Sequence, residues 1–207
     1  MQASGTVTEL LKRWLYDWNG ANVDLFLAIH RALPDGWSWL PELLSWIGSY
    51  WGTPAVVGGL LLWRFAAGNA VSRRLEVSLS KFVLGLALSL SASAIAKAAF
   101  ALPRPFMALG EAVYRAAAAP DSLYTLPSGH ATYIGVLVAT LWPLLDGASR
   151  TGLLLFAAVV GWSRIALGAH FPADVIAGYL LGWACVAAAG PAARRIAPKL
   201  ASTGATG

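Results

Sequence analysis

The segment "LSKFVLGLALSLSASAIAKAAFA", residues 79–101, is almost entirely apolar. The hydrocarbon core of a bilayer is about 30 Å thick, and a helix needs about 20 apolar residues to cross it. This segment is long enough, and its only charged side chains are Lys81 and Lys97, near its two ends. The segment therefore predicts a transmembrane helix.

Further apolar runs lie on both sides of this segment. Three follow it and two precede it: 128–145, 151–168, 171–193, 53–68 and 36–50. We therefore expect an all-α, polytopic membrane protein with six transmembrane helices in one bundle. The run at 36–50 is short, and Pro34 separates it from an apolar stretch at 23–32.

The N-terminal residues have a different pattern. Residues 5–17 alternate polar and apolar side chains at helical spacing, with Trp14 and Trp18 near the end of the segment. An amphipathic helix of this kind typically lies in the plane of the membrane surface. We expect an interfacial helix there, ahead of the first span.

The composition also indicates an integral membrane protein. Hydrophobic residues make up 57% of the 207 residues and charged residues 12%, and the mean hydropathy is +0.61. A soluble domain typically carries about 25% charged residues. The length suits one domain, which we place at residues 1–207. Cys185 is the only cysteine, so neither an intrachain disulfide nor a cysteine metal site is possible.

The net charge of +5 argues for membrane topology and against nucleic-acid binding, because the basic residues form short clusters between the apolar runs. With six spans, the main clusters fall on one side: Lys12, Arg13, Arg64, Arg73, Arg74, Arg150, Arg194 and Arg195. An excess of Lys and Arg marks the cytoplasmic side. We therefore expect both termini in the cytoplasm and the 102–127 loop outside.

Polar side chains gather at the outer ends of the predicted spans. They are Lys97, Arg104, Ser128, His130, Ser163, Arg164, His170 and Asp174. Gly129 belongs to the same group through its backbone N–H. Ionisable groups at membrane depth are costly and usually mark a pathway or a functional site. The six-span topology places all these positions on one face of the protein.

The cations in this set suggest a multiply charged anion as ligand. Arg presents a planar fork of donors that suits phosphate oxygens. The stretch "PSGH", residues 127–130, opens a predicted helix, where free backbone N–H groups and the helix dipole favour an anion. Lys97 considered alone could equally extend its ammonium group to the interface.

The two outer histidines suggest acid–base and nucleophilic chemistry. His170 and Asp174 are four residues apart on a predicted helix, so their side chains can meet. A carboxylate that accepts one imidazole N–H leaves the other nitrogen free to attack. His130 is then available as an acid–base partner, although a lone histidine at a helix start is more often a structural hydrogen bonder.

Three motifs contain these residues: "KAAFALPRP" (97–105), "PSGH" (127–130) and "SRIALGAHFPAD" (163–174). Together they resemble the signature of the type 2 phosphatidic acid phosphatases, the PAP2 superfamily. That signature reads Lys, six residues, Arg-Pro; then Pro-Ser-Gly-His; then Ser-Arg, five residues, His, three residues, Asp. The chain matches all three parts without a gap or a substitution.

The resemblance implies a metal-independent phosphatase that needs no cofactor. It implies that Lys97, Arg104 and Arg164 hold the phosphate oxygens. Ser128 and the backbone N–H of Gly129 would add hydrogen bonds to the same group. The fixed cations would then take the role that a metal ion often has in phosphoryl transfer.

The resemblance also implies the catalytic roles. His170 would be the nucleophile that forms a phosphohistidine, and Asp174 would orient it. His130 would protonate the leaving oxygen and then help water to cleave the intermediate.

The expected substrate is a lipid phosphate in the bilayer, handled at the outer face of a bacterial inner membrane, towards the periplasm or the cell exterior. The chain resembles small bacterial members that convert undecaprenyl diphosphate to undecaprenyl phosphate. Phosphatidylglycerophosphate, phosphatidic acid and lipid A phosphates remain alternatives, as does phosphate transfer to another lipid.

Two other classes of protein could carry some of these features. Vanadate-dependent haloperoxidases share the motifs, but they are soluble and larger. An anion channel could gather cations in a membrane, but it has no need for a His–Asp pair beside a second histidine.

Overall fold

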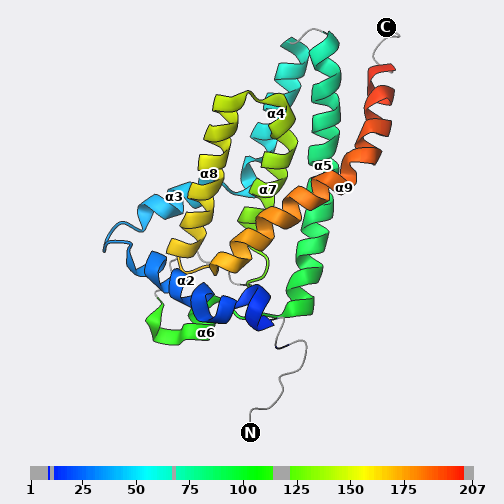
Figure 1. The fold of residues 1–207 in the computed structure, drawn as a ribbon. Coiled ribbons are helices and arrows are strands. Elements are labelled where there is room, and N and C mark those ends of the chain that lie inside the picture. Colours follow the sequence, from blue (N-terminus) through cyan, green and yellow to red (C-terminus); the bar gives the residue numbers. More distant parts are fainter. Residues whose placement is uncertain (1–8, 10–11, 67–68, 114–121, 203–207) are drawn as a thin grey trace.

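The computed structural model describes residues 9, 12–66, 69–113 and 122–202 (Figure 1). Regular structure in these residues is helical, apart from one isolated bridge between Pro103 and Tyr124. The predicted all-α class is therefore confirmed for the described part of the chain.

The α-helices in chain order are α2 (Ala21–Arg31), α3 (Trp39–Ile47), α4 (Thr53–Ala66), α5 (Asn69–Phe100), α6 (Pro105–Leu109), α7 (Gly129–Leu141), α8 (Gly147–Ala166) and α9 (Pro172–Ser202). Helices α4, α5, α7, α8 and α9 form the bundle, while α2 and α6 lie across one end of it (Figure 1). The predicted spans from 53 onwards each coincide with one bundle helix, although α5 begins well before residue 79.

Two of these helices have the length and composition needed to cross a membrane. They are Arg73–Phe100 within α5 and Pro172–Ala197 within α9. Both pack closely on α7, and the contact between α7 and α9 is nearly backbone to backbone. A Cβ atom at Gly182 would lie 2.2 Å from the carbonyl oxygen of Thr132, so only glycine fits there. At the start of the two helices, the backbone N–H of Ser128 donates to the carbonyl oxygen of Asp174 at 3.0 Å.

The predicted first span at 36–50 is wrong as a single membrane-crossing helix. Helix α3 has nine residues, which span about 14 Å, less than half of a bilayer core. It ends at Gly48, and Ser49 is extended (φ −86°, ψ 161°). Gly48 lies against the side chain of Val160, so α3 packs on α8 at the end of the bundle where α2 lies.

The structure does not show the predicted location of both termini on the cytoplasmic side, and the two ends of the described chain lie at opposite ends of the bundle (Figure 1). The hydroxyl of Tyr16 donates to Asp174 Oδ1 at 3.0 Å, at the start of α9. The C-terminal end of α9 lies at the opposite end of the bundle (Figure 1). Between these two points the chain therefore passes along the bundle an odd number of times.

The reason is that α2 covers the ends of α8 and α9 and does not cross the bundle. Phe26 is fully buried, with its ring centroid 5.2 Å from that of Phe171. The buried Asn22 Oδ1 accepts a hydrogen bond from the backbone N–H of Ala173 at 3.0 Å.

The predicted interfacial helix at 5–17 lies only partly within the described residues, because 5–8 and 10–11 fall outside them. Lys12–Tyr16 form a short π-helical turn with Trp14 and Leu15 exposed, at 63% and 73%.

Candidate active site

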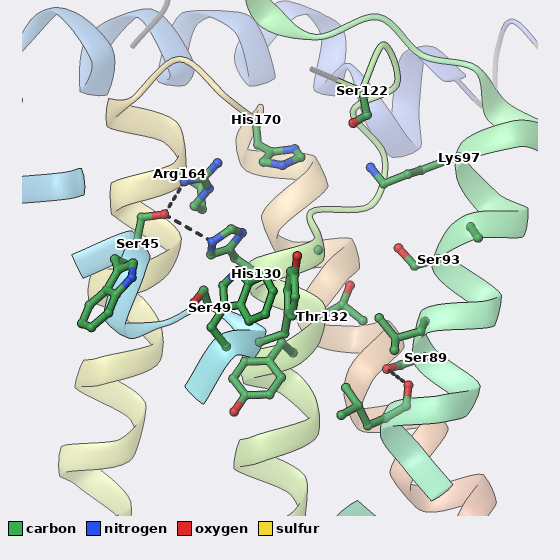
Figure 2. Close-up of a pocket in the computed structure, with 18 of the residues that line it drawn as sticks. Ser45, Ser49, Ser89, Ser93, Lys97, Ser122, His130, Thr132, Arg164 and His170 are labelled. Carbon is green, nitrogen blue, oxygen red and sulfur yellow. Dashed lines mark hydrogen bonds between the residues drawn. The ribbon is translucent and has the colours of Figure 1, made fainter. Parts of the chain in front are cut away.

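Most of the predicted site residues line one cavity (Figure 2), at the end of the bundle where α2 and α6 lie (Figure 1). The cavity has a volume of about 590 Å³. Six of the eight predicted site residues line it: Lys97, Arg104, Gly129, His130, Arg164 and His170. The other two lie next to the lining, where the backbone N–H of Ser128 donates to the carbonyl oxygen of Asp174 at 3.0 Å.

Arg164, at the end of α8, is 1% exposed, and its guanidinium has spare donors. Its Nη1 donates to Ser45 Oγ from α3, while Nε and Nη2 have no hydrogen-bond partner among the described residues. Buried polar groups in proteins are nearly always paired, since an unpaired donor costs about 1–3 kcal/mol and a charged one more. A buried cation with two spare donors is therefore well suited to an anionic ligand.

Ser128 is the N-cap of α7 and is fully buried, yet its hydroxyl has no partner among the described residues. The side chain does not cap the helix, so it does not occupy the N–H groups of the first turn at Gly129. A helix N-terminus with uncapped N–H groups attracts negative charge.

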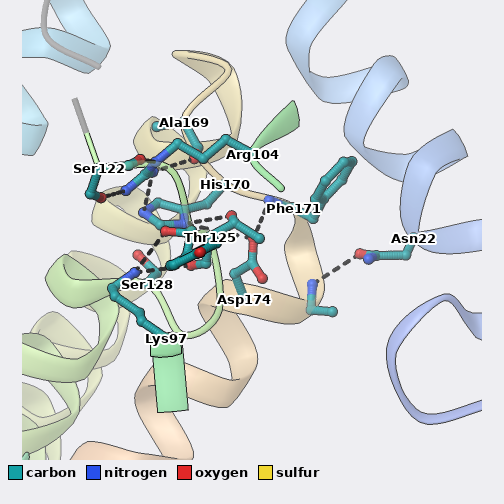
Figure 3. Close-up of polar contacts among 12 residues, drawn as sticks. Asn22, Lys97, Arg104, Ser122, Thr125, Ser128, Ala169, His170, Phe171 and Asp174 are labelled. Carbon is teal, nitrogen blue, oxygen red and sulfur yellow. Dashed lines mark hydrogen bonds and ion pairs between the residues drawn. The ribbon is translucent and has the colours of Figure 1, made fainter. Parts of the chain in front are cut away.

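Arg104 links two loops beside the cavity (Figure 3). Its Nε and Nη2 donate to the carbonyl and hydroxyl oxygens of Ser122 at 2.5 and 2.6 Å, and Nη1 donates to the carbonyl oxygen of Ala169 at 2.8 Å. Nη1 also lies 3.3 Å from His170 Nε2. Arg104 therefore holds the loop before α7 against the loop before α9, with its charge next to His170.

Lys97, near the end of α5, is half-buried and points into the same region. Its Nζ donates to the carbonyl oxygens of Tyr124 at 3.1 Å and Thr125 at 3.4 Å. The ammonium group thus lies at the cavity wall on the side of α5, facing the loop that leads to Ser128 (Figures 2 and 3).

His170 lies in the loop between α8 and α9 and is 2% exposed. Gly168 has a positive φ of 69°, which glycine adopts readily, and it turns the chain so that the His170 N–H reaches the Arg164 carbonyl at 3.2 Å. Burial lowers the pKa of His170 to about 4 and outweighs the opposite effect of Asp174. The imidazole is therefore neutral at pH 7, which the predicted role as nucleophile requires.

The side chains of His170 and Asp174 lie close together, but they do not form the direct hydrogen bond that the sequence predicts. Nδ1 and Asp174 Oδ2 are 3.6 Å apart, an ion-pair distance but too long for a hydrogen bond. Thr125 lies between them, with Oγ1 at 3.1 Å from Nδ1 and 2.5 Å from Oδ2. Asp174 Oδ2 also accepts from the backbone N–H of Phe171 at 2.8 Å.

His130, in the first turn of α7, faces the cavity opposite Arg164 (Figure 2). Its Nε2 is 3.3 Å from Ser45 Oγ, the same hydroxyl that receives the Arg164 donor. Ser45 is 5% exposed and joins the two predicted site residues.

Sequence reasoning missed four residues that contact the site: Tyr16, Ser45, Ser122 and Thr125. None belongs to a recurring spacing, and Ser45 lay inside a predicted span. Thr125 stands two residues before the "PSGH" motif, and its position there was the one available signal. Within the described ranges, no group of three or more His, Cys, Asp and Glu side chains could hold a metal ion.

Comparison with known proteins gives relatives with related activities. The chain is 32% identical over 163 residues to the putative undecaprenyl-diphosphatase YbjG of Escherichia coli K12, which covers 78% of this chain and 77% of that protein. It is 38% identical over 77 residues to phosphatidylglycerophosphatase B of the same organism. This match spans 35% of this chain and 30% of that protein.

The fold is also similar to a solved structure, that of Aquifex aeolicus LpxE. The TM-score is 0.69 at 22% identity, with 82% of this chain and 94% of that chain covered. The sequence profile of the PAP2 superfamily matches residues 78–195, more than half of the chain and a range that contains all three motifs. On these grounds the chain belongs to the PAP2 superfamily and is a phosphoric ester hydrolase.

Proposed function

We propose that this protein is an integral membrane lipid phosphatase, a single domain over residues 1–207, that removes a terminal phosphate through a phosphohistidine intermediate. The observation that carries the proposal is the cavity itself, where the unpaired buried donors of Arg164 lie with two histidines, His130 on α7 and His170 in the loop before α9. An anion channel could use the Arg164 donors, but it has no use for the two histidines.

In the first chemical step, Nε2 of His170 donates its lone pair to phosphorus, and the bond between phosphorus and the leaving oxygen breaks. His130 gives that oxygen a proton. The charge that develops on the equatorial oxygens is stabilised by Lys97, Arg104 and Arg164, which are fixed before the reaction begins. Ser128 and the Gly129 N–H add hydrogen bonds to the same oxygens.

In the second step, neutral His130 takes a proton from a water molecule whose oxygen attacks phosphorus. The bond between phosphorus and His170 Nε2 breaks, which releases inorganic phosphate and restores the neutral imidazole. No metal ion or cofactor takes part in either step.

The cavity walls support a lipid substrate. Away from the cations, the lining becomes apolar and aromatic, with Trp46, Trp51, Leu86 and Leu90. Trp51 and Leu90 are 73% and 58% exposed, on the outer surface of the bundle. A molecule with a phosphate at one end and a hydrocarbon tail at the other matches this change in polarity.

We propose undecaprenyl diphosphate as the preferred substrate, with undecaprenyl phosphate and phosphate as products. The match to the putative undecaprenyl-diphosphatase YbjG supports this choice, because it extends over 78% of this chain and 77% of that protein. Phosphatidylglycerophosphate or phosphatidic acid is the alternative, supported by the shorter match to phosphatidylglycerophosphatase B. Hydrolysis of lipid A phosphates, or phosphate transfer to another lipid, is a third possibility.

A competition assay tests both the reaction and the substrate. Purified protein in detergent would receive undecaprenyl diphosphate, phosphatidylglycerophosphate, phosphatidic acid and lipid A together in EDTA, and kcat/KM would be measured for each. We expect phosphate release without metal and the highest kcat/KM for undecaprenyl diphosphate. A requirement for Mg²⁺ would refute the metal-free mechanism, and a higher value for another lipid would identify that lipid as the substrate.

We propose that the protein lies in a bacterial inner membrane with its site on the outer face. The end of the bundle opposite the site is basic: Arg73, Arg74 and Arg194 share one cavity there, and Arg64 pairs with Glu76 at 2.7 Å. An excess of Lys and Arg marks the cytoplasmic side. Because α2 lies at the site end, the N-terminal segment belongs outside and the C-terminal end of α9 inside.

Cysteine labelling of intact cells tests this topology. Cys185→Ala gives a background without cysteine, into which Asp35→Cys (before α3) or Ala148→Cys (start of α8) is introduced; both positions are exposed. A membrane-impermeant maleimide should label Asp35→Cys in intact cells and Ala148→Cys only after permeabilisation. If Asp35→Cys also requires permeabilisation, the six-span topology with a cytoplasmic N-terminus is correct after all.

A further inference from the structure

The side chain of Thr125 occupies the space between the proposed nucleophile and its carboxylate (Figure 3). Thr125 is fully buried, as is Asp174, and His170 is 2% exposed, so water does not screen the contacts among them. The Thr125 hydroxyl is within hydrogen-bond distance of both partners, whereas His170 Nδ1 and Asp174 Oδ2 are 3.6 Å apart. The hydrogen-bonded link between Asp174 and the imidazole therefore runs through Thr125.

Counting hydrogens assigns the direction of each bond. A hydroxyl has one hydrogen, and an ionised carboxylate only accepts. The contact of 2.5 Å from Thr125 Oγ1 to Asp174 Oδ2 therefore uses the threonine hydrogen. Only lone pairs of Oγ1 remain for His170 Nδ1 at 3.1 Å, so Nδ1 must carry the imidazole hydrogen.

The other ring nitrogen gives the same answer independently. Arg104 Nη1 lies 3.3 Å from His170 Nε2, and a guanidinium nitrogen can only donate. Nε2 must therefore be the acceptor and carry no hydrogen. The tautomer with a lone pair on Nε2, the nitrogen that attacks phosphorus in the proposed mechanism, is the one that both contacts require.

Asp174 is held where it cannot easily replace Thr125. Its Oδ1 accepts from Tyr16 at 3.0 Å, and its Oδ2 accepts from the Phe171 N–H at 2.8 Å. Thr125 is fixed as well, since its N–H donates to the carbonyl oxygen of Leu102 at 2.9 Å. Movement of the carboxylate towards His170 would stretch these bonds.

We propose that Thr125 is a positioning residue for the reaction, one that fixes the tautomer and orientation of His170 and transmits the influence of Asp174 to it. The proposal rests on the proposed function of His170 as nucleophile. Thr125 does not touch the substrate, so its loss should lower kcat and leave KM nearly unchanged.

Three variants test this role. Thr125→Val keeps the shape and removes the hydroxyl, and Thr125→Ser keeps the hydroxyl and removes a methyl group. Thr140→Val is the matched control, because Thr140 is also fully buried but lies in the last turn of α7, and its hydroxyl has no partner among the described residues. We expect Thr125→Val to lower kcat by about 10²-fold, less than the roughly 10⁴-fold loss when the carboxylate that orients a catalytic histidine is removed, because Asp174 stays in place. Thr125→Ser should restore most of the rate, and Thr140→Val should match the unmodified protein.

The tautomer itself can be measured without turnover, by ¹⁵N NMR of histidine-labelled protein in detergent. There are three histidines, so His170 can be assigned from the spectrum of a His170→Asn sample. In the unmodified protein we expect the hydrogen on Nδ1, and in Thr125→Val a mixture of tautomers. This readout remains usable if Thr125→Val folds poorly, because the unmodified protein alone must show Nδ1–H.

The outcomes separate this proposal from the proposed function. A hydrogen on Nε2 in the unmodified protein, or unchanged kcat in well-folded Thr125→Val, would overturn the role of Thr125 while leaving His170 as nucleophile. Full activity of His170→Asn would overturn the proposed function, whatever the tautomer. Equal losses in Thr125→Val and Thr125→Ser would assign the effect to packing and also overturn the positioning role.

Discussion

Replacement of His170 by alanine is expected to abolish turnover, with a loss of about 10⁴-fold or more, because removal of a covalent nucleophile leaves only binding and electrostatic effects. The physical basis is the pairing of a buried, neutral imidazole with the cations that surround it. The measurement is release of inorganic phosphate from undecaprenyl diphosphate under single-turnover conditions, together with transfer of ³²P to the protein.

The label gives a second, independent result. A phosphate bound to histidine is a phosphoramidate, which acid cleaves and alkali preserves. We expect acid-labile label in the unmodified protein and none in His170→Ala. The matched control is His30→Ala, since His30 lies on α2, contacts the carbonyl oxygen of Ala166 and is not part of the cavity lining. Label that survives in His170→Ala would assign the nucleophile to another residue.

Replacement of Arg164 by methionine is expected to lower kcat/KM by about 10³-fold, the effect of losing preorganised donors to the transition state. The same change should leave the melting temperature unchanged or raise it. Arg164 buries a charge with no carboxylate contact among the described residues and with two donors unpaired, and such a group costs stability in the absence of ligand. The measurements are steady-state kinetics and thermal unfolding in detergent.

Opposite effects on activity and stability distinguish a binding role from a structural one. A melting temperature that falls together with activity would show that Arg164 mainly holds the fold. Ser45→Ala is a milder perturbation of the same site than Arg164→Met. It removes the hydroxyl that accepts the hydrogen bond from Arg164 Nη1 and contacts His130. Ser49→Ala is its control: Ser49 is also buried and lines the same cavity, but its hydroxyl has no partner among the described residues.

Much of the proposed site could be predicted from the sequence because its spacings are local. His170 and Asp174 are four residues apart, and the structure brings them to within 3.6 Å, although His170 lies in the loop before α9 and not on the predicted helix. The "PSGH" stretch was predicted to open a helix, and α7 begins at Gly129. Arg164 and Lys97 were placed near the ends of apolar runs, and both line the cavity.

The predicted count of six spans is not confirmed in the described residues, and the reason at the first span is equally physical. Hydropathy measures how apolar a stretch is and how long it runs, but not whether the helix breaks within it. The run at 36–50 contains a nine-residue helix that ends at Gly48, where close packing against Val160 excludes a side chain. In the apolar stretch at 23–32, Phe26 is buried against Ile165 of α8 and Phe171 before α9, while Leu25 is 47% exposed.

The sequence by itself determined the all-α class, the membrane-protein composition, the family and six of the residues that line the cavity, because each depends on residue type and short spacing. The tertiary structure alone decided what joins those residues. Thr125 lies 45 residues from His170 along the chain, and Ser45 lies 119 residues from Arg164. Contacts at such separations depend on how α3, α7, α8 and α9 pack, and packing follows from the shapes of surfaces that no local pattern encodes.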